Sequence, residues 1–263
     1  MGDTNIYYEV HGKGEPLVFI PGAGGTMDGF YRHIPVFARK YRVVAYDPRG
    51  AGRSDAPDIP YTMETLADDL ANLLDVIGID SAHIQGASIG GMIAQHFALR
   101  YPKRVISLIL ACGGLHSVTM VDPEMIRVAE RLLGLSLKER MMENLRLCVS
   151  QKFIDNNPGL VREQIANMMK HPAPPQTMMR HTQAVMGHNT YERLPEIKAP
   201  TLVIAGDADR YIPIENSRIL ASRIPGAELV ILRNMGHMFM FEAEDESNRI
   251  MLDFLKRHRS SVR

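Results

Sequence analysis

The stretch "HIQGASIGGMIAQHFAL" (residues 83–99) joins an apolar run to a helical pattern through one serine set between glycines. Ser88 has Gly86 two positions before it and Gly90 two positions after it. A strand that turns sharply into a helix strains the residue at its tip, and neighbours two positions away must be nearly free of side chains. Because a helical apolar pattern starts at Met92, the stretch predicts a strand, a tight turn and a helix.

Apolar runs of strand length recur along the chain, with helix-period segments between them. The runs that indicate buried strands are residues 15–22, 41–47, 82–86, 104–112, 199–206 and 227–233. Residues 5–12 alternate in polarity and predict an outer antiparallel strand. The clearest helical segments are 62–77, which Thr62 caps, and 242–257. This alternation predicts the α/β class, with a doubly wound and mainly parallel sheet.

Residues 116–197 interrupt the alternation, because they contain no convincing strand. Ser136 and Glu139 have the spacing of a capping box at a helix start. We expect four helices here, at residues 122–134, 136–152, 158–170 and 174–187.

Composition excludes several classes of protein. The chain has 263 residues and a formal net charge of zero, which argues against nucleic acid or an anionic membrane as partner. No apolar run approaches the ~20 residues of a membrane span, and residues 1–10 lack the pattern of a signal peptide. Cys112 and Cys148 lie in unrelated contexts, so we expect two free thiols and a cytoplasmic protein.

A serine hydroxyl becomes nucleophilic only beside a base that an acid orients. Open α/β sheets place such groups at the carboxyl ends of their strands. Asp207 and Asp209 follow the run 199–206, and His237 follows the run 227–233. These positions predict a Ser88, His237 and aspartate site, with the choice between the two aspartates still open.

Acyl transfer also needs N–H groups that stabilise an oxyanion. We expect one from Ile89, which follows the serine, and one from Ala23 in the loop "PGAGGT" (residues 21–26). This loop has Met27 where a dinucleotide-binding fingerprint needs its third glycine, and it lacks the Gly-Lys of a P-loop. Phosphate binding is therefore a minor alternative. No histidines have the spacing of metal ligands, so we expect neither a cofactor nor a metal.

These motifs together resemble the α/β-hydrolase superfamily over nearly the whole chain. They are "FIPGAGG" (19–25), "YDPRGAGRSDAP" (46–57), "GASIGG" (86–91), "GDADRYIP" (206–213) and "NMGH" (234–237), in family order. The resemblance implies Asp209 as the acid, with Asp207 as runner-up. It also implies a core of residues 1–115 and 198–263. Residues 116–197 would then be a helical cap between strands six and seven, and the family's first edge strand would be missing or shortened.

The resemblance is nearest to 3-oxoadipate enol-lactonases and small carboxylesterases, which implies hydrolysis of a small-molecule ester or lactone. Carbon–carbon hydrolases of meta-cleavage pathways are the alternative, but they typically carry an asparagine and a tryptophan where this chain has Ala87 and Met238. A non-catalytic receptor on the same fold is a third, weaker alternative. The sequence predicts no oligomeric state.

Methionines are frequent in the segment 116–197. Ordinary helix packing explains most of them, whereas a mobile lid whose thioethers line an apolar pocket would explain others. The second interpretation favours an apolar acyl part in the substrate. The nine are Met120, Met125, Met141, Met142, Met168, Met169, Met178, Met179 and Met186.

Overall fold

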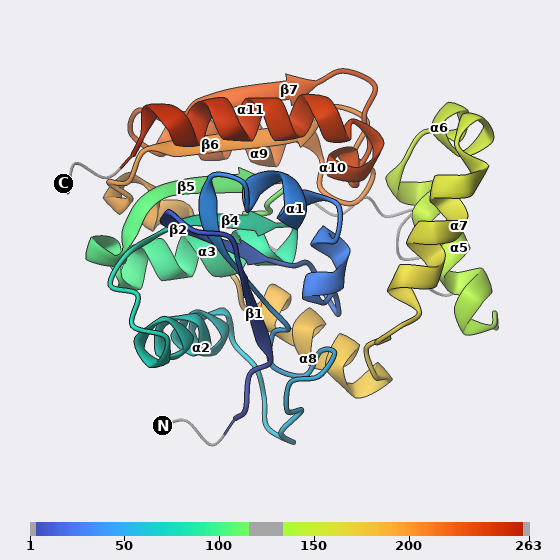
Figure 1. The fold of residues 1–263 in the computed structure, drawn as a ribbon, viewed down its shortest axis with the longest axis horizontal. Coiled ribbons are helices and arrows are strands. Elements are labelled where there is room, and N and C mark those ends of the chain that lie inside the picture. The colour runs from blue at the N-terminus through green and yellow to red at the C-terminus, as the bar shows by residue number, and fades with distance from the viewer. Residues whose placement is uncertain (1–3, 116–133, 260–263) are drawn as a thin grey trace.

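A computed structural model describes residues 4–115 and 134–259 of the protein (Figure 1). Its seven-stranded sheet has the order β1-β3-β2-β4-β5-β6-β7. Strand β1 pairs antiparallel with β3, and the other pairings are parallel. The predicted class and the antiparallel outer strand are therefore confirmed. The strands are β1 (Tyr8–His11), β2 (Glu15–Ile20), β3 (Tyr41–Tyr46), β4 (Ala82–Ala87), β5 (Val105–Ala111), β6 (Thr201–Gly206) and β7 (Glu228–Leu232).

The central strands β4, β5 and β6 are almost entirely buried and mainly apolar because helices cover both faces of the sheet. In β2, Val18 and Ile20 pack into the cluster on one face, whereas Leu17 and Phe19 pack into the cluster on the other. The first face is covered by α2 (Met63–Val76), α3 (Ile89–Arg100) and α9 (Ile214–Arg223). The second is covered by α1 (His33–Phe37), α10 (Phe239–Glu242) and α11 (Glu244–Arg257).

Helix α2 begins and ends close to the positions that its sequence predicts. The Thr62 side chain accepts a hydrogen bond from the N–H of Thr65, which caps the first turn. The predicted helix 242–257 is α11, and the separate short helix α10 precedes it. Short 3-10 turns complete the core as η1 (Met27–Phe30), η2 (Pro102–Arg104) and η3 (Tyr191–Glu196).

Within residues 134–200, which the structure describes, four α-helices lie between β5 and β6, and we call them the cap helices. They are α5 (Leu137–Cys148), α6 (Gln151–Asn156), α7 (Pro158–Met168) and α8 (Pro175–Met186). In Figure 1, α5, α6 and α7 stand together at one side of the sheet, and α8 lies apart from them. The resemblance implies a further edge strand before β1, which the described residues lack, and under that numbering β5 and β6 would be strands six and seven.

One predicted helix, 136–152, is wrong in its extent. Its start is correct, since Ser136 and Glu139 form the expected capping box. Helix α5 ends at Cys148, with Val149 as its C-cap. Ser150 then caps the next helix, α6, by accepting from the N–H of Phe153 at 3.2 Å. The helix predicted at 122–134 falls outside the described residues but for its last position. The division into a core and a cap at 116–197 stays a prediction.

The close approach of α3 to the sheet predicts that Gly90 cannot be replaced without loss of stability. A Cβ atom on Gly90 would lie 2.2 Å from the carbonyl oxygen of Ile20, which is backbone and cannot move aside. We expect Gly90→Ala to lower the free energy of unfolding by ~3 kcal/mol or more. Urea unfolding followed by circular dichroism measures this.

The matched control is Gly159→Ala in α7, where a Cβ atom would meet nothing within 4 Å. Its stability should stay the same or rise by up to about 1 kcal/mol, because alanine favours helix over glycine. Equal stability of the two variants would contradict the argument.

Candidate active site

Ser88 stands alone at the turn between β4 and α3. Its backbone has φ 57° and ψ −121°, a strained conformation for a residue with a side chain. The strain persists because the turn is held on both sides. The N–H of Ser88 donates to the carbonyl of Ala111 in β5 at 2.9 Å, and its carbonyl accepts from the N–H of Gly91 at 2.8 Å.

Gly86 and Gly90 permit this conformation because they have no side chains. A Cβ atom on Gly86 would lie 2.1 Å from the carbonyl oxygen of Gly90. The first turn of α3 therefore packs directly on the end of β4. This close packing presents the Ser88 side chain at the carboxyl edge of the sheet, where the sequence predicts it.

The structure brings His237 and Asp209 together at the same edge. The Nδ1 atom of His237 lies 2.6 Å from Oδ2 of Asp209. The other oxygen, Oδ1, accepts from the N–H groups of Tyr211 and Ile212 at 2.8 and 2.9 Å. Asp207, the runner-up, instead accepts from the N–H of Asn234 at 2.5 Å on the exposed side of the loop. The geometry therefore favours Asp209 as the partner of the imidazole.

His237 is set up to carry a proton. Burial lowers the pKa of His237, but the electrostatic effect of Cys112 and Asp209, with the hydrogen bond to Asp209, outweighs burial. The pKa is therefore raised well above the ordinary value of 6.5. An imidazole that accepts a proton readily, with its other nitrogen fixed by a carboxylate, is the arrangement of a general base.

Cys112 is a member of the site that sequence analysis did not place there. It directly follows β5, it is buried, and its backbone has φ 43°. Its sulfur lies within 4.8 Å of the side-chain donor atoms of Asp209 and His237. Its position at the end of a parallel strand beside β4 was the signal that could have identified it.

A thiol, a carboxylate and an imidazole are also donors that zinc accepts. Here Asp209 already accepts three hydrogen bonds, one of them from His237. These hydrogen bonds favour proton transfer over a zinc site as the role of the group.

The loop at residues 21–25 lies against the serine. A Cβ atom on Gly22 would be 3.3 Å from Cβ of Ser88. Among the hydrogen bonds of the described residues, none uses the N–H of Ala23 or of Ile89. Both N–H groups are thus available for an oxyanion formed at Ser88.

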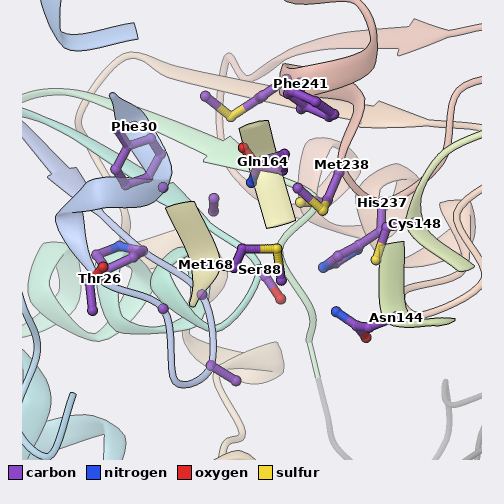
Figure 2. A pocket seen from close by; sticks show the side chains of 18 of the residues that line it. Thr26, Phe30, Ser88, Asn144, Cys148, Gln164, Met168, His237, Met238 and Phe241 are labelled. Carbon is purple, nitrogen blue, oxygen red and sulfur yellow. The ribbon is translucent and has the colours of Figure 1, made fainter. Parts of the chain in front are cut away.

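A cavity of about 380 Å³ opens over Ser88 (Figure 2). Ser88 and His237 both line it, as do Ala23 and Cys112. Figure 2 shows Gln164 among apolar side chains in the wall, with Asn144 and Cys148 beside His237. Burial raises the pKa of Cys148 to about 12, so its thiol stays neutral. The remaining wall is mainly apolar and includes Phe30, Met168, Met178, Met238, Met240 and Phe241.

The methionines of the cap helices divide between the two interpretations. Met168 and Met178 line the cavity, whereas Met141 and Met142 pack on the cluster formed by α5 and α7. Met120 and Met125 lie outside the described residues. Met179 and Met186 are exposed.

The end of cap helix α5 and the start of α6 contact the chain segment that carries His237. The carbonyl of Cys148 accepts from the N–H of Met238 at 2.9 Å, directly after His237. A Cβ atom on Gly236 would lie 2.2 Å from the same carbonyl oxygen. Ser150 also bonds to Glu242 through its N–H and its hydroxyl. The end of α5 therefore supports the loop that carries the imidazole.

Comparison with known proteins agrees with this fold. The family model described as "alpha/beta hydrolase fold" matches residues 15–140. A protein of Azorhizobium caulinodans named as a carbamate hydrolase, RutD, is 32% identical over 96% of both chains. A 2-hydroxy-6-oxo-6-phenylhexa-2,4-dienoate hydrolase of Burkholderia cepacia is 32% identical, covering 97% of this chain and 92% of its own.

A solved structure titled "Est816 as an N-Acyl homoserine lactone degrading enzyme" superposes with a TM-score of 0.83. It is 31% identical and the match covers 97% of this chain and 98% of that one. The chain belongs to the α/β-hydrolase family. Its membership confirms the resemblance seen in the sequence, and with it hydrolase chemistry in the broad sense.

Among the described helices, none combines the length and the apolar composition needed to cross a bilayer.

The environment of His237 predicts the pH dependence of any reaction in which it acts as a base. Because its pKa is raised, the ring is neutral only at higher pH, so kcat/KM should rise with pH through a midpoint above 6.5. Asp209→Asn should move the midpoint down and lower kcat by about 10²–10⁴. A pH series of initial rates with an activated ester measures both.

Asp207→Asn is the control, because asparagine keeps an acceptor for the N–H of Asn234 and does not contact His237. It should leave midpoint and rate near those of the wild type. A wild-type midpoint at or below 6.5, or equal losses in the two variants, would contradict the assignment.

Proposed function

We propose that the protein is a serine hydrolase that cleaves a carboxylic ester or lactone through an acyl-enzyme. One observation carries the proposal: a strained serine at a strand–helix turn opens into the cavity that also receives a histidine bonded to a buried aspartate. This combination costs stability and is typical of a nucleophile with its base.

In the proposed reaction, His237 takes the proton from the Ser88 hydroxyl as its oxygen attacks the carbonyl carbon. Asp209 holds the imidazole through Nδ1 and stabilises the positive charge that the ring acquires. The N–H groups of Ala23 and Ile89 stabilise the oxyanion. The alcohol leaves with the proton from His237, and water then hydrolyses the acyl-enzyme with His237 again as base.

The wall of the cavity supports an apolar acyl part. Six large apolar side chains and the neutral thiol of Cys148 surround the space above Ser88. They come from η1, α5, α7, α8 and residues 238–241, so the cavity accepts a body of several carbon atoms. A relative named for lactone degradation agrees with this substrate class.

Carbon–carbon bond hydrolysis is the second candidate, because a relative that is 32% identical to this chain is named for it. Against it stands the side chain after the histidine, which here is Met238 in the apolar wall. Carbamate cleavage, named for another relative, would use the same attack on a carbonyl. A receptor role has less support, because all three catalytic side chains are present.

The two buried, unpaired thiols favour a reducing compartment such as the cytoplasm.

The identity of the nucleophile is tested by covalent labelling. A fluorophosphonate probe should label the wild type and leave Ser88→Ala unlabelled, since the probe bonds only to an activated serine. Hydrolysis of p-nitrophenyl acetate should fall by about 10⁴ or more in the same variant.

The control is Ser107→Ala, since Ser107 is a buried serine of β5 that contacts His83. It should label like the wild type. Labelling of Ser88→Ala at the wild-type level, or its absence from the wild type, would contradict the proposal.

The substrate class is tested with a panel of p-nitrophenyl esters of rising chain length, a lactone, a carbamate ester and a vinylogous 1,5-diketone. We expect the highest kcat/KM among the esters or the lactone, with a rise as the acyl chain lengthens, because burial of each CH₂ group contributes ~0.8 kcal/mol. A diketone that exceeds every ester and lactone would establish carbon–carbon hydrolysis instead.

A further inference from the structure

His181 is a buried residue of cap helix α8 that touches two loops of the core. Its side chain is 1% exposed. The Nδ1 atom lies 3.0 Å from the N–H nitrogen of Gly24, in the loop beside Ser88. The Nε2 atom lies 3.1 Å from the carbonyl oxygen of Arg49. One imidazole therefore bridges the loop at residues 21–25 and the loop that follows β3.

The hydrogen positions in this bridge follow from its partners. The backbone N–H of Gly24 can only donate, so Nδ1 of His181 accepts. The ring proton then sits on Nε2 and donates to Arg49. Burial lowers the pKa of His181, which keeps the ring in the neutral form that this arrangement requires. A protonated ring could not accept from Gly24.

The far end of the bridge is firmly held. The guanidinium of Arg49 bonds to both oxygens of Asp69 at 2.7 and 2.5 Å, and both residues are buried. Thr177, also on α8, donates to the carbonyl of Gly50 at 2.6 Å. Helix α8 is thus fixed to the core, and His181 extends that attachment to the loop beside Ser88.

The peptide that His181 grips adjoins the proposed oxyanion donor. Gly24 has φ +62°, and the loop closes on itself through the N–H of Gly25 and the carbonyl of Gly22 at 3.0 Å. The Ala23–Gly24 peptide is joined to the Gly22–Ala23 peptide, which carries the N–H of Ala23, through φ and ψ of Ala23. Holding the first peptide, together with the contact of Gly22 on Ser88, therefore restricts where the N–H of Ala23 points. The hydrogen bond from Gly24 to His181 holds the Ala23–Gly24 peptide from outside the loop.

We propose that His181 is a positioning residue for the oxyanion hole, holding the loop at residues 21–25 so that the Ala23 N–H meets the transition state. The inference rests on the proposed serine hydrolase function. It makes helix α8 part of the catalytic apparatus as well as a wall of the cavity. Loss of the grip should lower kcat with little change in KM, because a donor for the oxyanion acts mainly in the transition state.

Two isosteric substitutions separate the two hydrogen bonds. The carbonyl of asparagine occupies nearly the position of Nδ1, so His181→Asn can still accept from Gly24. The end of glutamine occupies nearly the position of Nε2, so His181→Gln keeps only the contact with Arg49. We expect His181→Asn to stay within about threefold of the wild-type kcat, and His181→Gln and His181→Leu to lose ~10–10².

A second readout detects the oxyanion hole directly. A trifluoromethyl ketone forms a tetrahedral adduct with an activated serine, and its oxyanion uses the same N–H donors. Its inhibition constant should rise in His181→Gln and His181→Leu in proportion to the loss of kcat, while His181→Asn stays close to the wild type. Ser107→Ala is the control for lost stability alone, because it removes a buried hydrogen bond to His83 that involves neither α8 nor the loop beside Ser88. It should lower the unfolding temperature and keep kcat.

The outcomes are distinct. Wild-type kcat in His181→Leu would overturn the inference, and so would equal losses in His181→Asn, His181→Gln and Ser107→Ala, which would indicate only a structural role. If Ser88→Ala retained turnover, the proposed function itself would fail. If Ser88→Ala were inactive while His181→Leu kept full activity, only the role of His181 would fail.

Discussion

The structure depends on one steric constraint, the close backbone packing of the first turn of α3 on the sheet. Gly86 allows this turn to approach β4, and Gly90 allows it to approach the end of β2. This contact forces Ser88 into a conformation that a residue with a side chain rarely adopts. The parallel sheet supplies the rigidity that maintains the strain. The same sheet brings β5, β6 and β7 to one edge, so the groups that follow them converge on the serine without further adjustment.

The electrostatic environment then determines how Asp209, His237 and His181 differ in behaviour. Asp209 is buried and fully hydrogen-bonded, so it stays fixed while it raises the proton affinity of His237. The two histidines of the apparatus have opposite environments. Burial dominates at His181 and keeps the ring neutral, whereas at His237 the neighbouring Cys112 and Asp209 dominate. One imidazole is thus suited to hold a backbone amide and the other to exchange a proton.

Sequence patterns predicted those features that depend on local rules. The strands were predictable because both faces of the sheet are covered, and Ser88, His237 and an aspartate at 207 or 209 follow from the ends of parallel strands. The choice of Asp209 came from the family resemblance. The end of α5 was not predictable, because the cap at Ser150 depends on Glu242, 92 positions away. The contact of His181 was not predictable for the same reason, since its partner Gly24 is 157 positions distant. Neither contact leaves a periodic signal in the sequence.

The attachment of the cap helices at two separate points limits how such a protein can change its specificity. One end of the cap supports the loop of the base through Cys148, and the other reaches the glycine loop through His181. A cap transplanted as a block from another family member would alter the pocket and also remove both supports. We therefore expect exchange of single wall residues to change the substrate range at a smaller cost to the site than replacement of the whole segment.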